Sequence, residues 1–280
     1  MRILTHLQGF LRLQWAKQRP PLIPSVDECK IIKNFIKKEV YNSNKILKIL
    51  ILGSTPRFRD LAHSFKSEVT CADMNIDMLP AMAALMTNPR AAEKEVWVRA
   101  NWLQMPLRNN YYDIVLGDWV ISNLPLKLQS VFFKKISLLI RSGGHFITRA
   151  SLYSGDLVPF EKALKLWLSG KWDNSHLMMS AAHLDFNPHT YQSHSARFRV
   201  KGAQAISKLM WQEKNKQNKS KLKQAIKVLK EWLPTGMTWI YTPKNVLELI
   251  IEKYFQIKKI DYARDHYLAQ ACPIYFLRKR

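Results

Sequence analysis

The chain has 280 residues, of which 47% are hydrophobic, so it can bury a substantial core and is not an intrinsically disordered chain. Its 44 Lys and Arg residues against 21 Asp and Glu residues give a formal charge of +23, which favours partners that carry phosphate. The basic residues are spread over both halves of the chain, which excludes a dedicated basic module in either half.

The cysteines and the hydropathy pattern narrow the setting of the protein. Cys29, Cys71 and Cys272 lie far apart and form no C-x-x-C pair, which argues against a disulfide framework and a structural zinc site. We therefore expect no metal and a reducing, cytoplasmic location. No run of eighteen apolar residues occurs, so we expect no transmembrane segment.

The N-terminal segment, residues 1–45, is predicted to be helical. Four apolar side chains of this segment fall on one helical face: Leu4, Leu7, Leu11 and Trp15. An amphipathic helix packed on the domain fits this pattern better than a transit peptide, because the segment lacks a long apolar centre and a small-residue cleavage site.

Residues 46–149 alternate between strand and helix patterns. The predicted strands cover residues 46–52, 68–75, 95–102, 111–119 and 145–150. Helices are predicted over residues 59–65, 76–86 and 126–140, and a turn over residues 141–144. This alternation predicts an α/β fold with a doubly wound, mostly parallel sheet.

Residues 150–245 break the alternation, and we expect a helical insertion that forms a substrate lobe. A lysine-rich run at 213–233 places Leu222, Ile226, Leu229 and Leu233 on one face. It predicts a surface helix with solvated lysines, and the alternative is a phosphate-binding surface. Residues 246–280 are expected to add a final helix and an antiparallel strand pair at the sheet edge, completing the core.

The predicted sheet brings four strand ends to one edge, at Gly53, Asp73, Asn101 and Asp118. A carboxylate at Asp73 can accept hydrogen bonds from both ribose hydroxyls of an adenosine, either in NAD or in S-adenosylmethionine. The loop at residues 53–57, GSTPR, has one glycine and loses an amide at its proline, so it suits a ligand without a pyrophosphate. A dehydrogenase is therefore disfavoured.

Five motifs in this order resemble the class I S-adenosylmethionine-dependent methyltransferases, over residues 46–149 and 255–279. They are LGSTPR at 52–57, CADMNIDML at 71–79, ANWLQMPLRNNYYDIVLGDW at 100–119, IRSGGHFITR at 140–149 and PIYFLRKR at 273–280. The first loop looks most like that of a bacterial subgroup with Leu-Gly-x-Thr-Pro. The resemblance implies a Rossmann-like, seven-stranded sheet with an antiparallel last strand, and S-adenosylmethionine as cofactor.

The resemblance also implies roles for single residues. Gly53 and Ser54 would face the methionine part and Asp73 the ribose. It implies three residues near the adenine, Met74, Asn101 and Trp102, and it implies Asp118 near the sulfonium. Arg57 and Asn101 depart from the subgroup, which often has Glu and Asp there. Arg57 either pairs with the methionine carboxylate or marks weakened cofactor binding.

The sequence therefore predicts an S-adenosylmethionine-dependent methyltransferase of the EC 2.1.1 class that acts on a small-molecule or peptide acceptor. RNA is the alternative acceptor, motivated by the charge and the lysine run, and a non-catalytic binding protein that retains the fold is the alternative from another class. A hydroxyl or protonated amine acceptor needs a general base, for which the candidates are Asp118, His183, His189 and His194. The histidine spacings argue against a zinc site.

Overall fold

The computed structural model describes residues 5–41, 44–152, 158–182, 195–197, 204–210, 219–232 and 238–280. The chain divides into two compact units. The first consists of Met1–Leu152 together with Pro243–Arg280, and the second of Tyr153–Thr242.

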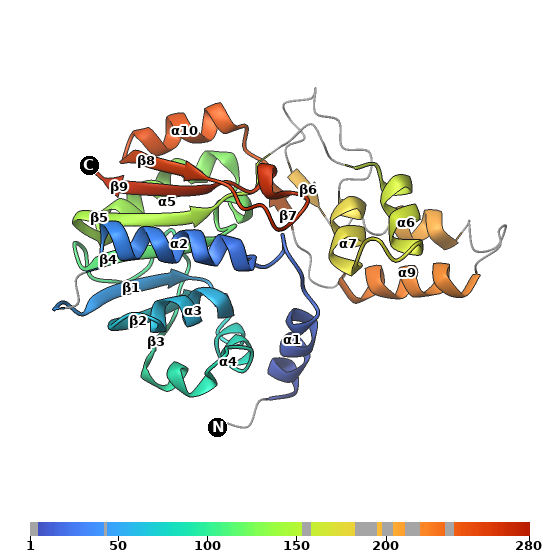
Figure 1. Ribbon diagram of the computed structural model, residues 1–280, viewed down its shortest axis with the longest axis horizontal. Helices are drawn as coiled ribbons and strands as arrows, with labels where there is room; N and C mark the ends of the chain where they lie inside the picture. The colour runs from blue at the N-terminus through green and yellow to red at the C-terminus, as the bar shows by residue number, and fades with distance from the viewer. Residues whose placement is uncertain are drawn as a thin grey trace. The chain divides into compact units, whose positions relative to one another are not determined.

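The first unit contains a seven-stranded sheet with the order β3-β2-β1-β4-β5-β9-β8 (Figure 1). Its strands are β1 Leu47–Leu52, β2 Ser67–Asp73, β3 Val96–Arg99, β4 Tyr112–Asp118, β5 Ile140–Arg149, β8 Phe255–Asp261 and β9 Ile274–Lys279. Strands β1 to β5 run parallel to one another, whereas β9 is antiparallel to both β5 and β8. The prediction of a mostly parallel α/β sheet is confirmed.

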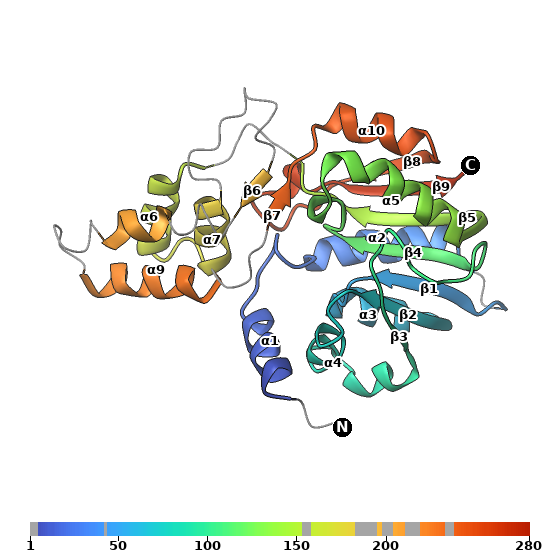
Figure 2. The same ribbon diagram turned by 180° about the vertical axis from the view of Figure 1, so that it is seen from behind.

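The central strand shows why an apolar run becomes the middle of such a sheet. Five of the six residues of β1 are fully buried, and successive side chains point to opposite faces. Ile49 and Ile51 join a cluster with residues of α2 Val26–Glu39 and α3 Pro56–His63. Leu50 and Leu52 join the opposite cluster with residues of α5 Leu126–Leu139 and α10 Lys244–Glu252 (Figures 1 and 2).

The helix starts of the first unit follow local capping rules. The α2 helix begins after a capping box in which the Ser25 hydroxyl accepts from the Glu28 amide and the Glu28 carboxylate accepts from the Ser25 amide. Helix α3 has Pro56 in its first turn, where a missing amide hydrogen costs nothing. The remaining short elements of this unit are α1 His6–Ala16, α4 Met78–Ala83, η1 Pro89–Lys94, η2 Ile121–Asn123 and η5 Ala269–Ala271.

Two sequence predictions in this unit were wrong in extent. The helix expected over residues 76–86 is limited to the six residues of α4. The turn expected over residues 141–144 belongs to β5, which starts at Ile140. A Cβ atom on Gly144 would lie 2.9 Å from the Asp113 carbonyl oxygen, so this glycine permits the close approach of β5 to β4 and is not a turn residue.

The second unit is mainly helical in its described part. It contains α6 Phe160–Leu168, α7 Asn174–Ala182, a helical stretch at 204–210, and α9 Lys219–Trp232. Strands β6 Ser195–Arg197 and β7 Thr238–Ile240 form an antiparallel pair. Helix α9 buries Leu222, Ile226 and Leu229, and its lysines are exposed, so the helix predicted for the lysine-rich run is confirmed over these residues.

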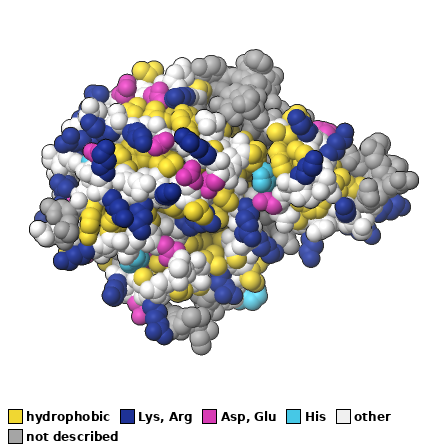
Figure 3. Space-filling model, in the orientation of Figure 1, with side chains coloured by type: hydrophobic (Ala, Val, Ile, Leu, Met, Phe, Trp, Pro, Cys, Tyr) yellow, Lys and Arg dark blue, Asp and Glu magenta, His cyan; other side chains and the backbone are white. Residues whose placement is uncertain are grey.

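Basic side chains lie over the surface of the molecule (Figure 3), and the three cysteines are unpaired. Figure 3 shows Lys and Arg side chains distributed over the visible face of the molecule. Cys29, Cys71 and Cys272 all lie in the described residues and are free thiols. In the described part of the chain, no helix has the length and apolar character needed to cross a membrane.

Candidate functional site

The loop after β1 lies between two carboxylates that end the neighbouring strands. Gly53 has a φ of +89°, a left-handed conformation that favours glycine, and its amide donates to the Ala72 carbonyl oxygen at 2.8 Å. A Cβ atom at Gly53 would lie 3.8 Å from Cζ2 of Trp102 and 4.0 Å from Oδ2 of Asp73. The turn therefore presents its backbone directly beside these two side chains.

Adjacent hydroxyls of this loop reach the carboxylates on either side. The Ser54 hydroxyl donates to Oδ2 of Asp73 at 3.2 Å, at the end of β2. The Thr55 hydroxyl donates to Oδ2 of Asp118 at 3.1 Å, at the end of β4. Because β1 lies between β2 and β4 in the sheet, the loop connects both strand ends into one polar edge.

Burial dominates the electrostatics of this edge. It raises the pKa of Asp73 above its usual value, although the Asn75 amide and the Ser54 hydroxyl oppose the shift. It also raises the pKa of Asp118, and there the positive charge of Arg149 opposes the shift. Two desolvated carboxyl groups thus flank the loop, an arrangement that favours hydroxyl donors and positively charged groups as ligands.

Three residues predicted to lie near an adenine differ in exposure. The Trp102 indole is partly buried and its Nε1 donates to the Ala72 carbonyl oxygen at 2.8 Å, so it belongs to the cluster with Gly53 and Asp73. Met74 is 66% exposed. Asn101 is exposed, and its side-chain oxygen accepts from the Leu103 amide at 3.0 Å. The structure brings Trp102 into the site and leaves the other two side chains at its solvent side.

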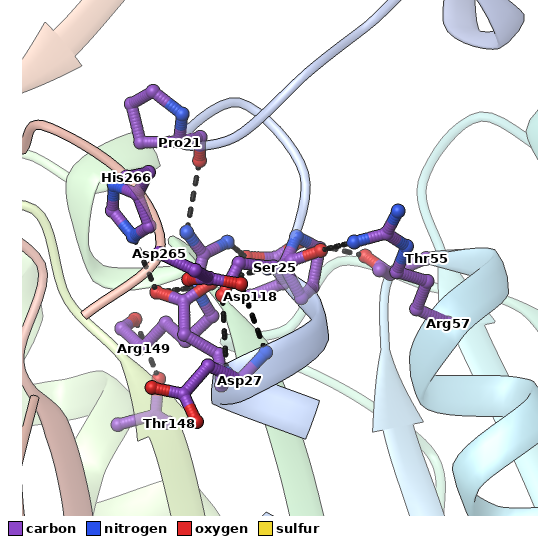
Figure 4. A network of polar contacts seen from close by, with 12 residues as sticks. Pro21, Ser25, Asp27, Thr55, Arg57, Asp118, Thr148, Arg149, Asp265 and His266 are labelled. Atoms are coloured by element: carbon purple, nitrogen blue, oxygen red, sulfur yellow. Dashed lines mark hydrogen bonds and ion pairs between the residues drawn. The ribbon is translucent and has the colours of Figure 1, made fainter. Parts of the chain in front are cut away.

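Asp118 belongs to a buried charge network around Arg149, the last residue of β5 (Figure 4). The Arg149 side chain is fully buried, and its Nη1 donates to Oδ1 of Asp118 at 2.5 Å. Its Nε lies 2.9 Å from Oε1 of Glu28, an ion pair without hydrogen-bond alignment. Its Nη2 donates to the Pro21 carbonyl oxygen at 2.9 Å. One guanidinium thereby joins β5, β4, α2 and the segment before α2.

The two acids of this network respond differently to burial. Burial alone would raise the pKa of Glu28, but Arg149 and hydrogen bonds from His266 and Ser25 bring it below its usual value. Nε2 of His266 lies 3.3 Å from Oε1 of Glu28. The two carboxylates raise the pKa of Arg149 despite its burial. The guanidinium is therefore the fixed positive charge that both acids share.

Two arginines also hold the segment between α1 and α2 at this edge of the sheet. Arg149 donates to the Pro21 carbonyl oxygen, and Nη1 of Arg57 donates to the Pro24 carbonyl oxygen. Arg57 was predicted to meet the methionine carboxylate of a cofactor or to mark a weakened site. In the structure one of its donors serves the protein itself, so Arg57 anchors this segment beside the loop at residues 53–57.

The residue after Asp118 has an unusual backbone. Trp119 has a φ of +52°, which is uncommon for a bulky residue and occurs where the surrounding structure enforces it. Its amide donates to the Arg149 carbonyl oxygen at 3.2 Å, and its ring lies 5.6 Å from Cζ of Arg149. The packing around Arg149 therefore determines the turn that follows β4.

His183, His189 and His194, the predicted base candidates of the insertion, lie outside the described residues. Among the residues that are described, no three or more His, Cys, Asp and Glu side chains form a group that could hold a metal ion.

Sequence reasoning missed Thr55, Glu28 and Arg149. A sequence signal exists for two of them: Ser25-Val-Asp-Glu28 is a capping-box pattern, and Arg149 is a charge that ends an apolar strand. Neither signal links Glu28 to Arg149, because their contact arises only when α2 packs beside the end of β5.

Comparison with known proteins gives one family match. Residues 52–148 match the family model described as a methyltransferase domain. The matched region starts at the last residue of β1 and ends within β5, so it includes Gly53, Asp73 and Asp118. The match supports methyltransferase activity for this part of the chain. A search of curated protein sequences found no match.

Solved structures share the fold at low sequence identity. A Rhodobacter sphaeroides protein described as a Zn-dependent alcohol dehydrogenase is 14% identical with a TM-score of 0.59, covering 99% of this chain and 100% of its own. The PH0226 protein from Pyrococcus horikoshii OT3 is 10% identical with a TM-score of 0.54, covering 95% and 99%. An S-adenosylmethionine-dependent methyltransferase from Methanosarcina mazei is 12% identical with a TM-score of 0.52, covering 89% and 96%. At these identities the likeness concerns the fold alone.

Proposed function

We propose that this chain is an S-adenosylmethionine-dependent methyltransferase whose acceptor is a small molecule or a peptide. The observation that carries the proposal is the cluster of Gly53, Ser54, Asp73 and Trp102 at the carboxyl edge of the sheet. The sheet order with β9 antiparallel and the methyltransferase-domain match over residues 52–148 support it.

The residues present fit this cofactor. The left-handed Gly53 leaves its Cβ position open, with nothing nearer than 3.8 Å, so backbone can lie against a ligand there. Asp73 is the residue we assign to the ribose hydroxyls, Gly53 and Ser54 to the methionine part, and Trp102, Met74 and Asn101 to the adenine. S-adenosylmethionine supplies a methyl group on a positively charged sulfur.

The chain's own residues would act by binding, orientation and exclusion of water, which are the main requirements of an in-line displacement. Asp118 has one carboxylate oxygen engaged by Thr55 and the other by Arg149. We therefore propose Asp118 as a residue that orients the loop and contributes negative charge. His183 stays a prediction for the general base.

Calorimetric titration with S-adenosylhomocysteine tests cofactor binding. We expect saturable binding to the wild type, weakened at least about tenfold by Asp73→Ala, because the ligand loses its hydrogen bonds to a partly buried carboxylate. Glu68→Ala is the matched control, since Glu68 is an exposed acid at the other end of β2. Absence of binding to the wild type, or equal loss in both variants, would contradict the proposal.

The acceptor class and the non-catalytic alternative need a transfer assay. Purified protein with methyl-labelled cofactor is incubated with small-molecule, protein and RNA fractions of a lysate. Label in the small-molecule or protein fraction supports the proposed acceptor, and label in RNA favours the alternative acceptor. Binding of S-adenosylhomocysteine without transfer to any fraction would indicate a binding protein that retains the fold.

A further inference from the structure

A pocket opens at the sheet edge opposite to the candidate cofactor site. It is formed where β5 and β8 begin and β9 ends, near the C-terminal end of the chain marked in Figure 1. Its volume is about 770 Å³, and its lining residues are Arg141, Ser142, Gly143, Gln256, Arg278, Lys279 and Arg280. All of them belong to the first unit, and none belongs to the cofactor cluster.

Positive charge dominates this pocket. Four of its lining side chains are cationic, and no carboxylate side chain lines it among the described residues. Arg278 and Arg280 are exposed. Within the part of the chain that the structure describes, neither guanidinium has a hydrogen-bond or ion-pair partner. Both are therefore available to a ligand.

The other two cations are built into the pocket wall. Nζ of Lys279 donates to Oδ1 of Asn110 at 2.6 Å and to the Ile140 carbonyl oxygen at 2.7 Å. Nε of Arg141 donates to Asp113, a carboxylate that also forms an ion pair with Lys45 at 2.5 Å. One acid is thus shared by two cations, so the wall is held in place while an excess of positive charge remains.

Gly143 lines the pocket beside Arg278. Gly143 has a φ of +72°, and the nearest atom to a Cβ placed on it is Nη2 of Arg278, at 3.7 Å. The Arg278 guanidinium therefore lies beside the partly exposed backbone of β5 at Gly143 without an intervening side chain.

A neighbouring histidine, His145, lies close to the cations of the pocket. His145 pairs with Arg278 across β5 and β9. Its pKa is lowered to about 4 by burial and by the positive charges of Arg278, Arg141 and Lys258, with Glu39 opposing. The cations around the pocket therefore add to the effect of burial on His145.

We propose that this pocket binds a compact polyphosphate group, of the kind that a nucleoside diphosphate or triphosphate carries. Unpaired guanidiniums match phosphate oxygens in shape and charge. A pocket of this volume suits a small ligand, whereas a nucleic acid needs a longer basic track with stacking surfaces. The proposal is independent of the methyltransferase activity.

Inorganic pyrophosphate is the probe, titrated into the full chain by calorimetry at about 100 mM salt, where exposed charges are partly screened. We expect one saturable site, weakened roughly tenfold or more by Arg278→Gln with Arg280→Gln, since two charge-assisted contacts are lost. The affinity of Arg278→Lys with Arg280→Lys for pyrophosphate should lie between that of the wild type and that of the double Gln variant, because the charge is kept and the bidentate geometry is lost. ATP should compete with pyrophosphate.

The matched control is Arg90→Gln with Lys94→Gln, two exposed cations of η1 beside β3 at the far side of the sheet. No binding to the wild type would overturn the proposal. Equal weakening in the control would overturn it as well, because binding would then depend on the general positive charge of the protein and not on this pocket. Displacement by single-stranded RNA but not by ATP would overturn it as well. Asp73→Ala should leave pyrophosphate binding unchanged, so a failure here and a failure of cofactor binding are distinguishable. Thermal unfolding checks that each variant is folded.

Discussion

Asp73 is a carboxyl group whose burial raises its pKa while Ser54 and Asn75 already donate to it. A ribose that donates to this group binds the ionised form, so protonation competes with the ligand. We predict that affinity for S-adenosylhomocysteine is constant above the pKa of Asp73 and falls as the pH drops through it. That pKa lies above the ordinary 3.8.

Titrations between pH 7.5 and pH 4.5 measure this dependence. In Asp73→Asn the affinity should be lower throughout and should lose the decline at acidic pH. An unchanged decline in Asp73→Asn would assign the titration to another group.

Glu95, the residue before β3, has a lowered pKa, in contrast to Asp73. Its side chain is buried, and its two oxygens accept from Nε and Nη2 of Arg59 at 3.1 and 2.5 Å. Burial opposes ionisation, but His63, Arg59 and Trp97 lower the pKa from 4.5 to about 2. A depressed acid pKa contributes stability above pH 4.5 that is lost as the pH falls towards 2. The contribution corresponds to about 3 kcal/mol.

Urea unfolding from pH 7 to pH 3 tests this second prediction. Glu95→Gln should be less stable than the wild type at pH 7, because Arg59 is left buried without its charge partner, and the difference should shrink as the pH falls. Glu68→Gln, an exposed acid in β2, should keep the wild-type pH dependence. A constant difference between wild type and Glu95→Gln would refute the assignment.

Arg149 acts between elements, because it connects the ends of β4 and β5 with α2 and the segment before it. Arg149→Met leaves Asp118 and Glu28 buried without their positive partner. We expect a loss of roughly 3–5 kcal/mol in the free energy of unfolding. Arg278→Met is the control, since Arg278 is an exposed arginine in neighbouring β9 and should change stability by less than about 0.5 kcal/mol. Similar losses in both variants would argue against a structural role for the buried pairs.

Helices and strands could be predicted from the sequence where the hydropathy pattern matches the burial of the side chains. Continuous apolar runs identified β1 and β4, and the helix over α5 was placed to within one residue at its end. The start of β5 was missed because Gly143 and Gly144 look like a turn in sequence. Gly144 in fact allows close contact with the Asp113 backbone, and this contact depends on a neighbouring strand whose position the sequence alone does not give.

The candidate site was predictable in part for the same reason. Parallel strands end at one edge, so Gly53, Asp73 and Asp118 could be brought together from their positions alone. The pairing of Arg149 with Glu28 could not, because it depends on how α2 packs on the sheet. The pocket lined by Arg141 and Arg278 could not be predicted either, because these residues become neighbours only through the antiparallel insertion of β9.

At the scale of the whole molecule, the strand order determines when the sheet can be completed during translation. Strand β9 comes last in the sequence, yet it lies between β5 and β8 and pairs with both. As the chain leaves the ribosome, the edge of β5 stays unpaired until residues 274–279 have emerged. The whole of the second unit, Tyr153–Thr242, is therefore translated before the sheet of the first unit can close.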